Sequence, residues 1–394
     1  MMNKIFLKPG KEKAVVRHHP WIFSGAIDTV MGDPDNGSSV QVFDSKKNFL
    51  GTGAFSPYSQ IRVRMWSFDN EEIDQTFFEK RIDVSIKRRL YLMKKYDDSA
   101  WRLIHAESDQ IPGLIVDQYN DVLVIQILSS GSEYHRNTIV DALKKITGLN
   151  NIYERSDLDV RKIEGLKERT GPISGKIPHE ILIKEGGHQF IVDLENSQKT
   201  GFYLDQRINR RIVSDYCMDK AVLNVFSFTG GFSIYAAGRN AKNVVSLDSS
   251  NDALELAKRN HTLNGFTDNG HEWIEGDAFQ LLRKMRDQNK KFDVVILDPP
   301  KFAPTAAHVD KAARAYKDIN LLGFKLLNPA GILVTFSCSG GLNEGLFQKI
   351  VSDAALDAGA YATILEKLNQ GPDHPVSLNF PEGAYLKGLI CLKN

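Results

Sequence analysis

From about residue 198 onward the chain alternates short apolar runs with helical patterns, and this alternation constrains the fold more than any other feature. The apolar runs are AVLNVF, NVVSLD, HEWIEGD, FDVVILD and GILVTFS, followed by a weaker pair near the end. The clearest helical pattern covers residues 251–265, where Ser249 and Asp252 have capping-box spacing and Gly265 suits a C-cap. Such alternation predicts a mostly parallel sheet with helices on both faces, which binds ligands at the carboxyl ends of its strands.

The residues before this region have a different pattern of apolar runs, turn residues and helical spacing, which predicts two further domains. Residues 1–74 carry short β-rich runs broken by clusters of turn residues, as is typical of a small all-β module. Residues 75–187 begin with a helical pattern at 76–96 and continue as a small α+β piece, with two strands joined by a polar turn at 119–121. We therefore expect three domains, at 1–74, 75–187 and 188–394.

Composition excludes several classes of protein. Lys and Arg total 50 against 49 Asp and Glu, and hydrophobic residues make up 42% of the chain, which excludes a disordered or fibrous chain. A nucleic-acid binder that is basic throughout is also excluded, so any basic patch is local. Three cysteines fit a reducing compartment.

The uncharged run at residues 221–238 is about as long as a short membrane span, but its polar and glycine residues favour a tight turn between a strand and a helix. The first residues have no apolar stretch long enough for a signal peptide. We expect a cytoplasmic protein with no membrane partner and no metal site.

Three of the predicted strand ends carry residues suited to a nucleoside cofactor. The first ends in NVFSFTGGF, whose paired glycines let a ligand approach the backbone, although an ordinary strand–helix turn explains them as well. Asp248 follows 18 residues after Gly230 and suits the ribose hydroxyls of a nucleotide or the cap of a helix. Asp277 can accept a hydrogen bond from an adenine amino group. Together these residues do not separate NAD from S-adenosylmethionine.

The fourth and fifth strand ends, DPPKF and TFSCSGG, carry candidate catalytic residues. Asp298 precedes two prolines, which fix the backbone and let a rigid acid hold a planar base. Cys338 follows its strand among serines and glycines, as in an exposed loop. A cysteine taken alone is more often a small buried hydrophobe than a nucleophile.

With these residues assembled, the chain resembles the class I S-adenosylmethionine-dependent RNA methyltransferases, and more narrowly the RlmI-type cytosine-5 methyltransferases of large-subunit (23S) ribosomal RNA. The resemblance rests on QKTGFYLDQR at 198–207, NVFSFTGGF, DPPKF, RAYKDIN at 314–320 and FSCS. The opening segment, LKPGKEKAVVRHHPWIFSGAI, resembles the PUA domain of that family, and residues 75–185 resemble its central domain. The fold it implies is α/β: a Rossmann-like methyltransferase domain preceded by a PUA-like all-β domain and a small α+β domain.

The resemblance also implies a cofactor, S-adenosyl-L-methionine, and its binding residues. These are Gln198, Thr200, Phe202, Asp205, Arg207, Asn224, Phe226, Gly230, Gly231, Asp248 and Asp277. Carbon 5 of cytosine is a poor nucleophile until a thiolate adds to carbon 6, so the implied nucleophile is Cys338, with Asp298 hydrogen-bonding the base. Lys301 stands where another group of cytosine-5 methyltransferases has a second cysteine, so the base that removes the carbon 5 proton is not identified.

A local basic segment predicts contact with RNA. Between Lys4 and Arg17 there are five basic residues and one acid, followed by His18, His19, Trp21 and Phe23, of which Trp21 is better explained as a core residue. A second basic set, at residues 87–95, is more simply a solvated helix face. The residues expected to contact ribosomal RNA are Lys8, Lys11, Arg17, Lys301, Arg314 and Lys317.

Other functions remain open from the residues alone. Uracil-5 methyltransferases also combine a D-P-P-like motif with a cysteine, so the nucleophile does not decide the base. A guanine-nitrogen methyltransferase needs no cysteine, and a non-catalytic RNA-binding protein needs neither Asp298 nor Cys338. A dehydrogenase has no use for DPPKF or FSCS at its strand ends. The modified nucleotide and the oligomeric state do not follow from the sequence.

Overall fold

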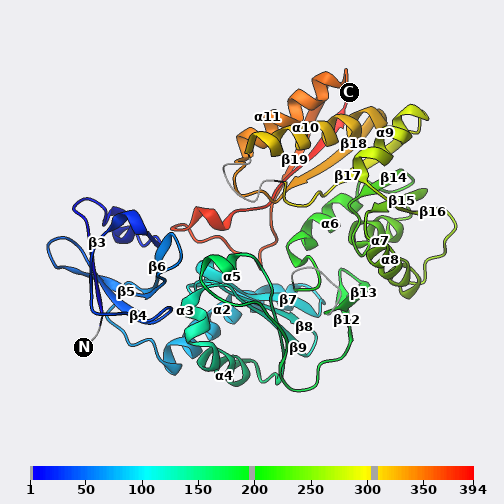
Figure 1. The fold of residues 1–394 in the computed structure, drawn as a ribbon. Helices are drawn as coiled ribbons and strands as arrows, with labels where there is room; N and C mark the ends of the chain where they lie inside the picture. Colours follow the sequence, from blue (N-terminus) through cyan, green and yellow to red (C-terminus); the bar gives the residue numbers. More distant parts are fainter. Residues whose placement is uncertain (1–2, 195–199, 303–308) are drawn as a thin grey trace. The chain divides into compact units, whose positions relative to one another are not determined.

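The computed structural model describes residues 3–194, 200–302 and 309–394. They form two compact units (Figure 1). The first unit consists of residues 1–183, 192–204 and 372–383, and the second of residues 184–191, 205–371 and 384–394. The chain crosses between the units within the hairpin formed by β12 (Glu180–Glu185) and β13 (His188–Asp193). The division into three domains stays a prediction.

The first sheet of the first unit confirms that residues 4–67 are mainly β-structure. Its six strands have the order β2-β6-β5-β4-β1-β3. They are β1 (Lys4–Leu7), β2 (Trp21–Phe23), β3 (Ile27–Met31), β4 (Ser39–Phe43), β5 (Phe49–Phe55) and β6 (Ile61–Ser67). Alternate residues such as Ile5, Leu7, Val40 and Val42 form the core, as a strand period of two requires.

The second sheet of this unit has five strands in the order β11-β10-β9-β8-β7. They are β7 (Ala100–His105), β8 (Leu114–Tyr119), β9 (Val122–Ile127), β10 (Asn151–Ser156) and β11 (Arg169–Ser174). The helices of this part are α2 (Gln75–Lys95), α3 (Ser130–Tyr134), α4 (Arg136–Thr147) and the short α5 (Val160–Ile163). The predicted helix at 76–96 and the turn at 119–121 are confirmed. The largely exposed edge strand β11 escaped prediction because RTGPIS contains a glycine and a proline.

The expectation that the basic residues of α2 form a solvated face is wrong for Arg89. Its side chain is 1% exposed and donates two hydrogen bonds to the carboxylate of Asp109, at 3.0 and 2.7 Å. Further hydrogen bonds run from Arg89 to the carbonyl oxygens of Ser85 and Arg102. A buried guanidinium needs such a complete set of acceptors, and only the packing of α2 decides which of its consecutive basic residues turns inward.

The second unit contains a seven-stranded sheet in the order β16-β15-β14-β17-β18-β20-β19. Its strands are β14 (Ala221–Val225), β15 (Asn243–Asp248), β16 (His271–Glu275), β17 (Phe292–Leu297), β18 (Leu327–Ser337), β19 (Ala362–Leu368) and β20 (Lys387–Lys393). All pairings from β16 to β18 are parallel, whereas β20 runs antiparallel to both of its neighbours. The predicted strands, including the weaker pair near the end, and the mostly parallel sheet are confirmed.

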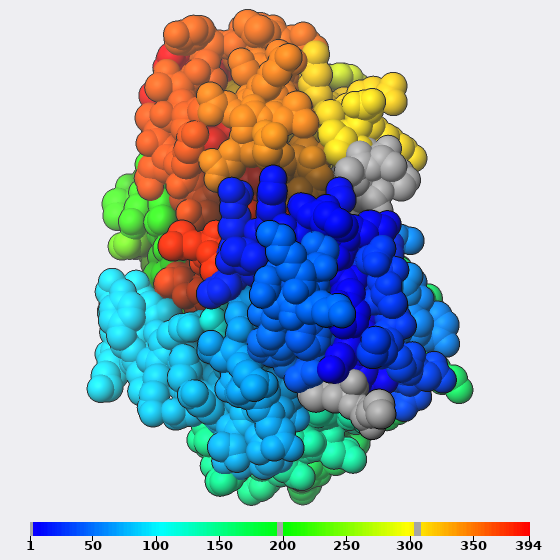
Figure 2. Space-filling view, turned by 90° about the vertical axis from the view of Figure 1, so that its left-hand side faces the viewer, coloured from blue at the N-terminus to red at the C-terminus, as the bar shows by residue number. Residues whose placement is uncertain are grey.

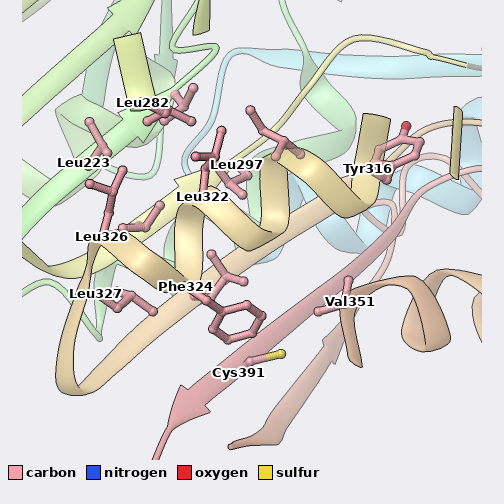
Figure 3. Close-up of a cluster of buried hydrophobic side chains, with 14 of the residues drawn as sticks. Leu223, Leu282, Leu297, Tyr316, Leu322, Phe324, Leu326, Leu327, Val351 and Cys391 are labelled. Carbon is pink, nitrogen blue, oxygen red and sulfur yellow. The ribbon is translucent and has the colours of Figure 1, made fainter. Parts of the chain in front are cut away.

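Helices cover both faces of this sheet (Figure 1). On one face lie α6 (Arg207–Ser214), α7 (Gly231–Gly238) and α8 (Asn251–Leu263), and on the other α9 (Ala278–Asp287), α10 (Val309–Leu326) and α11 (Glu344–Asp357). The two faces have separate cores: Leu223 and Val225 of β14 pack with α9 and α10, whereas Val222 packs with α7. Figure 3 shows Leu297 and Leu322 meeting in the first of these cores. Truncating a buried leucine here would cost about 2–5 kcal/mol.

The caps of α8 correct one detail of the prediction. Ser250, and not Ser249, is the N-cap, because its hydroxyl accepts a hydrogen bond from the backbone N–H of Ala253 at 3.2 Å. Two adjacent serines offer the same chemistry, so the sequence pattern did not decide between them. Gly265 ends the helix in the left-handed conformation with φ of 75°, as expected of a C-cap glycine.

The uncharged run at 221–238 forms β14, a tight turn and α7, as predicted. Within the three described ranges, no helix is long and apolar enough to span a bilayer.

Two histidines of the second unit predict a loss of stability in acid. His261 and His271 have ring centroids 4.1 Å apart, and burial lowers the pKa of both, that of His271 to about 3. In the unfolded chain both would protonate near pH 6.5, so their contribution is complete above that pH and is lost below it, for His271 as the pH falls toward about 3. The loss would reach at most about 1.4 kcal/mol per pH unit for each histidine.

Urea denaturation at pH 7 and pH 5 tests this expectation. His271→Phe keeps the stacking on Trp273, where the ring centroids lie 5.0 Å apart, but removes the titrating group, so the fall in stability should be smaller than in the parent protein. An equal fall in the parent protein and in His271→Phe would contradict the assignment to His271.

Candidate functional site

The register of the parallel strands brings several predicted site residues to one edge of the second unit's sheet. Val225, the last residue of β14, lies opposite Leu247 on one side and opposite Leu297 on the other. Asp248 and Asp298 directly follow these two leucines, so both carboxylates leave the sheet at the same level. The chain after β14 leaves at that level too, which makes this edge the candidate site.

The loop after β14 is strained. Phe226 and Phe228 have φ values of 61° and 47°, in the left-handed region that residues with a side chain rarely adopt. Each such residue costs about 1–3 kcal/mol and persists only where its surroundings hold it. Asp248 supplies one such restraint, because its carboxylate accepts hydrogen bonds from the backbone N–H groups of Phe228, at 2.8 Å, and Ser250, at 3.0 Å.

Three buried polar atoms of the same loop region suit a polar ligand. The Asn224 amide oxygen and the Ser227 and Thr229 hydroxyl oxygens are buried, and none has a hydrogen-bond partner among the described residues. The amide nitrogen of Asn224 does have one, the Ser233 hydroxyl at 2.8 Å, which fixes the orientation of the amide group. A buried polar group without a partner costs about 1–3 kcal/mol, so a ligand with matching polar groups would bind here with a gain.

The two glycines of the loop lie close to other residues of the protein itself. Gly230 has φ of 85°, and a Cβ on it would lie 3.0 Å from the Cβ of Ala257. A Cβ on Gly231 would lie 3.1 Å from the Cδ of Arg210. The tight strand–helix turn therefore explains Gly230 without a ligand.

Other predicted cofactor residues have partners within their own unit. Asp205 accepts a hydrogen bond from the Tyr385 hydroxyl at 2.6 Å. Arg207 is 2% exposed and lies 3.4 Å from the buried carboxylate of Glu185. Asp277 is the N-cap of α9, accepting from the backbone N–H of Gln280 at 2.9 Å.

Thr200 and Phe202 belong to the first unit, where both contact Tyr119. The Tyr119 and Thr200 hydroxyls are 3.2 Å apart, and the backbone N–H of Phe202 donates to the Tyr119 oxygen at 3.2 Å. Burial raises the pKa of Tyr119, so its hydroxyl keeps its proton. Gln198 lies outside the described residues.

A chain of side-chain amides holds Asp298. Gln206 donates to its carboxylate at 2.9 Å, and the Gln206 oxygen accepts from Asn209 at 2.6 Å. Asn209 donates in turn to the carbonyl oxygen of Asn369 at 3.0 Å. Both amide residues are 2% exposed. Sequence reasoning missed Gln206, although it lies within the QKTGFYLDQR motif beside residues that were selected.

Cys338 differs from the two other cysteines of the chain. Cys217 and Cys391 are buried, and burial raises the pKa of both to about 12, whereas Cys338 is partly exposed. It directly follows β18. The next residue, Ser339, has its hydroxyl 3.1 Å from that of the buried Tyr316. A partly exposed thiol in a restrained loop is the arrangement that a nucleophile needs.

Two more buried contacts hold the loop after Cys338. The ammonium group of Lys387 donates to the carbonyl oxygens of Ser339, at 2.9 Å, and Leu342, at 2.8 Å. Lys387 is 7% exposed. Sequence reasoning missed this lysine too, because no motif marks it.

The predicted RNA-binding residues lie on both units. Lys8, Lys11 and Arg17 are exposed on the first unit, whose N-terminal residues appear in dark blue on the face shown in Figure 2. Lys301 and Arg314 are exposed on the second. Lys317 forms an ion pair with Asp357 at 2.8 Å, which offsets its charge. Among the residues that the structure describes, no group of three or more His, Cys, Asp or Glu side chains could hold a metal ion.

Two family models match the chain. Residues 5–68 match the model of a PUA-like domain, and residues 169–390 match that of an S-adenosylmethionine-dependent methyltransferase. The ribosomal RNA large subunit methyltransferase I of Tolumonas auensis is 51% identical over 393 residues, which cover 99% of each chain. The protein of the same name from Aeromonas salmonicida is 51% identical over 388 residues, 98% of each chain.

Solved structures share the fold. A protein from Streptococcus mutans that is classed as a SAM-dependent methyltransferase superposes with a TM-score of 0.86 at 22% identity, and the match covers both chains completely. A second solved structure, of a protein classed as a methyltransferase and complexed with SAH, gives a TM-score of 0.87 at 22% identity and the same coverage.

The position of Asp248 predicts its effect on cofactor affinity. Asp248→Ala removes the acceptor of the Phe228 N–H and the carboxylate expected at the ribose, so the affinity for S-adenosylhomocysteine should fall at least about tenfold, or about 1.4 kcal/mol. Asp252 is exposed in the first turn of α8, and Asp252→Ala is the matched control. Calorimetric titration of both variants measures the difference, and equal affinities would rule out the ribose assignment.

Proposed function

The chain belongs to the S-adenosylmethionine-dependent methyltransferase family, with the large-subunit ribosomal RNA methyltransferases I as relatives along its whole length, and we propose that it forms 5-methylcytosine in 23S ribosomal RNA. It is an S-adenosylmethionine-dependent ribosomal RNA methyltransferase with a PUA-like domain. The choice of carbon 5 rests on Cys338, a partly exposed cysteine that directly follows β18. In the sheet, β18 pairs with β17, the strand that ends just before Asp298.

The first step that we propose is addition of the Cys338 thiolate to carbon 6 of the cytosine ring. A sulfur–carbon bond forms, and the electron pair of the carbon 5–carbon 6 double bond moves into the ring, which makes carbon 5 nucleophilic. S-adenosylmethionine, when bound, would supply an electrophilic methyl group on a positively charged sulfur. Carbon 5 would take this methyl group, and the electron pair of the broken bond would stay with the sulfur.

The second step restores the aromatic cytosine ring. A proton acceptor removes the proton from carbon 5, and the electron pair of the broken carbon–hydrogen bond re-forms the double bond to carbon 6. The Cys338 thiolate leaves as this double bond forms. In this scheme Asp298 hydrogen-bonds the cytosine at nitrogen 3 or at its amino group, and Gln206 holds the carboxylate in place through the 2.9 Å contact. Because Lys301 occupies the position of a second cysteine, we propose that a water held by Asp298 accepts the proton.

The cofactor would lie along the loop after β14. The unpartnered oxygens of Asn224, Ser227 and Thr229 suit the polar groups of its methionine part, beside Phe226 and Gly230–Gly231. Asp248 would accept from the ribose hydroxyls. Asp277, which caps α9 through one carboxylate oxygen, would accept from the adenine amino group with the other. Gln198, Thr200, Phe202, Asp205 and Arg207 would enclose the remainder.

RNA would contact cations of both units. Lys8, Lys11 and Arg17 would bind phosphates through the PUA-like domain, and Lys301, Arg314 and Lys317 would act close to the reacting base. The target cytosine must be unpaired or turned out of its helix to bring carbon 6 within reach of Cys338. Because ribosomal RNA is the substrate, we infer that the enzyme acts in the cytoplasm.

Loss of the thiol tests the covalent mechanism. Cys338→Ala should abolish methyl transfer to ribosomal RNA, because carbon 5 is then never activated, while S-adenosylhomocysteine affinity by calorimetry stays unchanged. Cys217→Ser is the matched control: the buried Cys217 contacts the carbonyl oxygen of Val213, a bond that serine keeps, and full activity is expected. Methylation that persists in Cys338→Ala would refute the thiolate adduct.

Nucleoside mass spectrometry identifies the base. Ribosomal RNA from cells that lack the gene should lose one 5-methylcytosine, and the parent gene, but not Cys338→Ala, should restore it. A missing 5-methyluridine would instead mean a uracil-5 methyltransferase, and a missing methylguanosine would overturn both the base and the mechanism. No change in any nucleoside would indicate a non-catalytic RNA-binding protein.

The cations of the PUA-like domain should contribute to RNA affinity. In a triple variant, Lys8, Lys11 and Arg17 are each changed to alanine. Log affinity falls as log salt rises, and the magnitude of this slope should decrease by about 2 in the variant, at roughly 0.7 per phosphate contact of a single strand. A triple alanine variant of Lys87, Lys94 and Lys95, exposed lysines of α2, removes the same charge elsewhere on the first unit. Equal slopes for the two variants would exclude a specific role for the N-terminal cations.

A further inference from the structure

Lys387 begins the antiparallel strand β20 and lies opposite Ser337, the last residue of β18. Cys338 comes directly after Ser337, so the lysine stands beside the start of the loop that carries the cysteine. A lysine that is 7% exposed is uncommon, because burial of an ammonium group is costly unless its hydrogen bonds are satisfied.

The contacts of Lys387 explain how it stays buried. Its ammonium group donates to the carbonyl oxygens of Ser339 and Leu342, at 2.9 and 2.8 Å, and so ties both ends of the turn that follows Cys338. Neither acceptor carries a full charge, so the positive charge of Lys387 is not cancelled by its hydrogen bonds.

Three groups from other parts of the second unit act electrostatically on Lys387. Burial lowers its pKa, Cys338 and Glu344 of α11 raise it, and Lys301 after β17 lowers it. Tyr316 of α10 interacts electrostatically with Cys338, and burial raises the pKa of this tyrosine, which keeps it neutral. Lys387 and Cys338 therefore act on each other electrostatically.

We propose that Lys387 is a positioning residue for Cys338, which fixes the loop after the cysteine and favours its thiolate through a buried positive charge. This inference rests on the proposed role of Cys338 as nucleophile. A free cysteine has a pKa of about 8.5 and is therefore only a few per cent thiolate at pH 7. A neighbouring cation lowers this pKa and so raises the fraction of the cysteine that is present as the reactive thiolate. The same charge stabilises the thiolate again when carbon 6 releases it.

A second lysine of the same strand separates this proposal from a purely structural role. The ammonium group of Lys393, at the other end of β20, donates to the carbonyl oxygens of Phe324 and Leu327 at 3.0 and 2.9 Å. Burial lowers its pKa as well. Lys393 thus makes the same kind of contact as Lys387, but at the end of β20 remote from the loop that carries Cys338.

The test is the pH dependence of Cys338 alkylation in the full-length protein. Iodoacetamide is the probe: the thiolate sulfur displaces iodide and forms a sulfur–carbon bond, and mass spectrometry follows the peptide that contains Cys338. In Lys387→Met the rate profile should shift by about one pH unit to the alkaline side, with alkylation about tenfold slower at neutral pH. Lys387→Arg keeps the charge and should restore most of the rate, whereas Lys393→Met should leave the profile unchanged.

Lys387→Gln covers the case in which methionine prevents folding, because glutamine keeps a donor for the carbonyl oxygens but not the charge, and the same alkaline shift is expected. An unchanged profile in a folded Lys387→Met or Lys387→Gln protein would overturn the proposal. A shift of equal size in Lys393→Met would do so too. Persistent methylation by Cys338→Ala would refute the catalytic role of the cysteine and leave the alkylation profile as it is, so the two failures are distinguishable.

Discussion

The parallel pairing of β14, β15, β17 and β18 is the constraint on which the rest of the second unit depends. Because Val225 lies opposite both Leu247 and Leu297, the chain leaves three neighbouring strands at one level, and the polar residues that follow them share one edge. Apolar cores on both faces of the sheet hold this register, since a slip of one residue would turn each core side chain to the opposite face. The stability of the cores thus fixes the geometry of the site.

The loop after β14 at that edge contains both backbone strain and unpaired buried polar atoms. Phe226 and Phe228 have left-handed backbone conformations, and the buried oxygens of Asn224, Ser227 and Thr229 have no partner within the described ranges. Strain and unpaired polar groups both lower the stability of the folded chain, and both occur in the loop where a cofactor would bind. A ligand that pairs those oxygens would recover part of this free energy, which makes binding and the order of the loop interdependent.

Much of this arrangement follows from local patterns in the sequence. The strands of the second unit are short apolar runs, and Asp248, Asp298 and Cys338 were predicted at one edge because each directly follows such a run. Gln206, Tyr316 and Lys387 escaped prediction, because their roles depend on contacts with residues at least 23 positions away. Arg89 was assigned to the wrong face for the same reason, since its partner Asp109 is 20 residues away.

The direction of β20 gives the edge a property that a fully parallel sheet would lack. A parallel strand begins at the edge opposite to the one where the ligand-binding loops lie, so its first residue is remote from them. β20 runs antiparallel to β18, and its first residue, Lys387, therefore lies beside Ser337 at the end of β18. Lys393, six residues later, lies at the opposite edge and contacts Phe324 and Leu327 instead. Reversal of a single strand is thus what brings a buried cation to Cys338 without an additional loop.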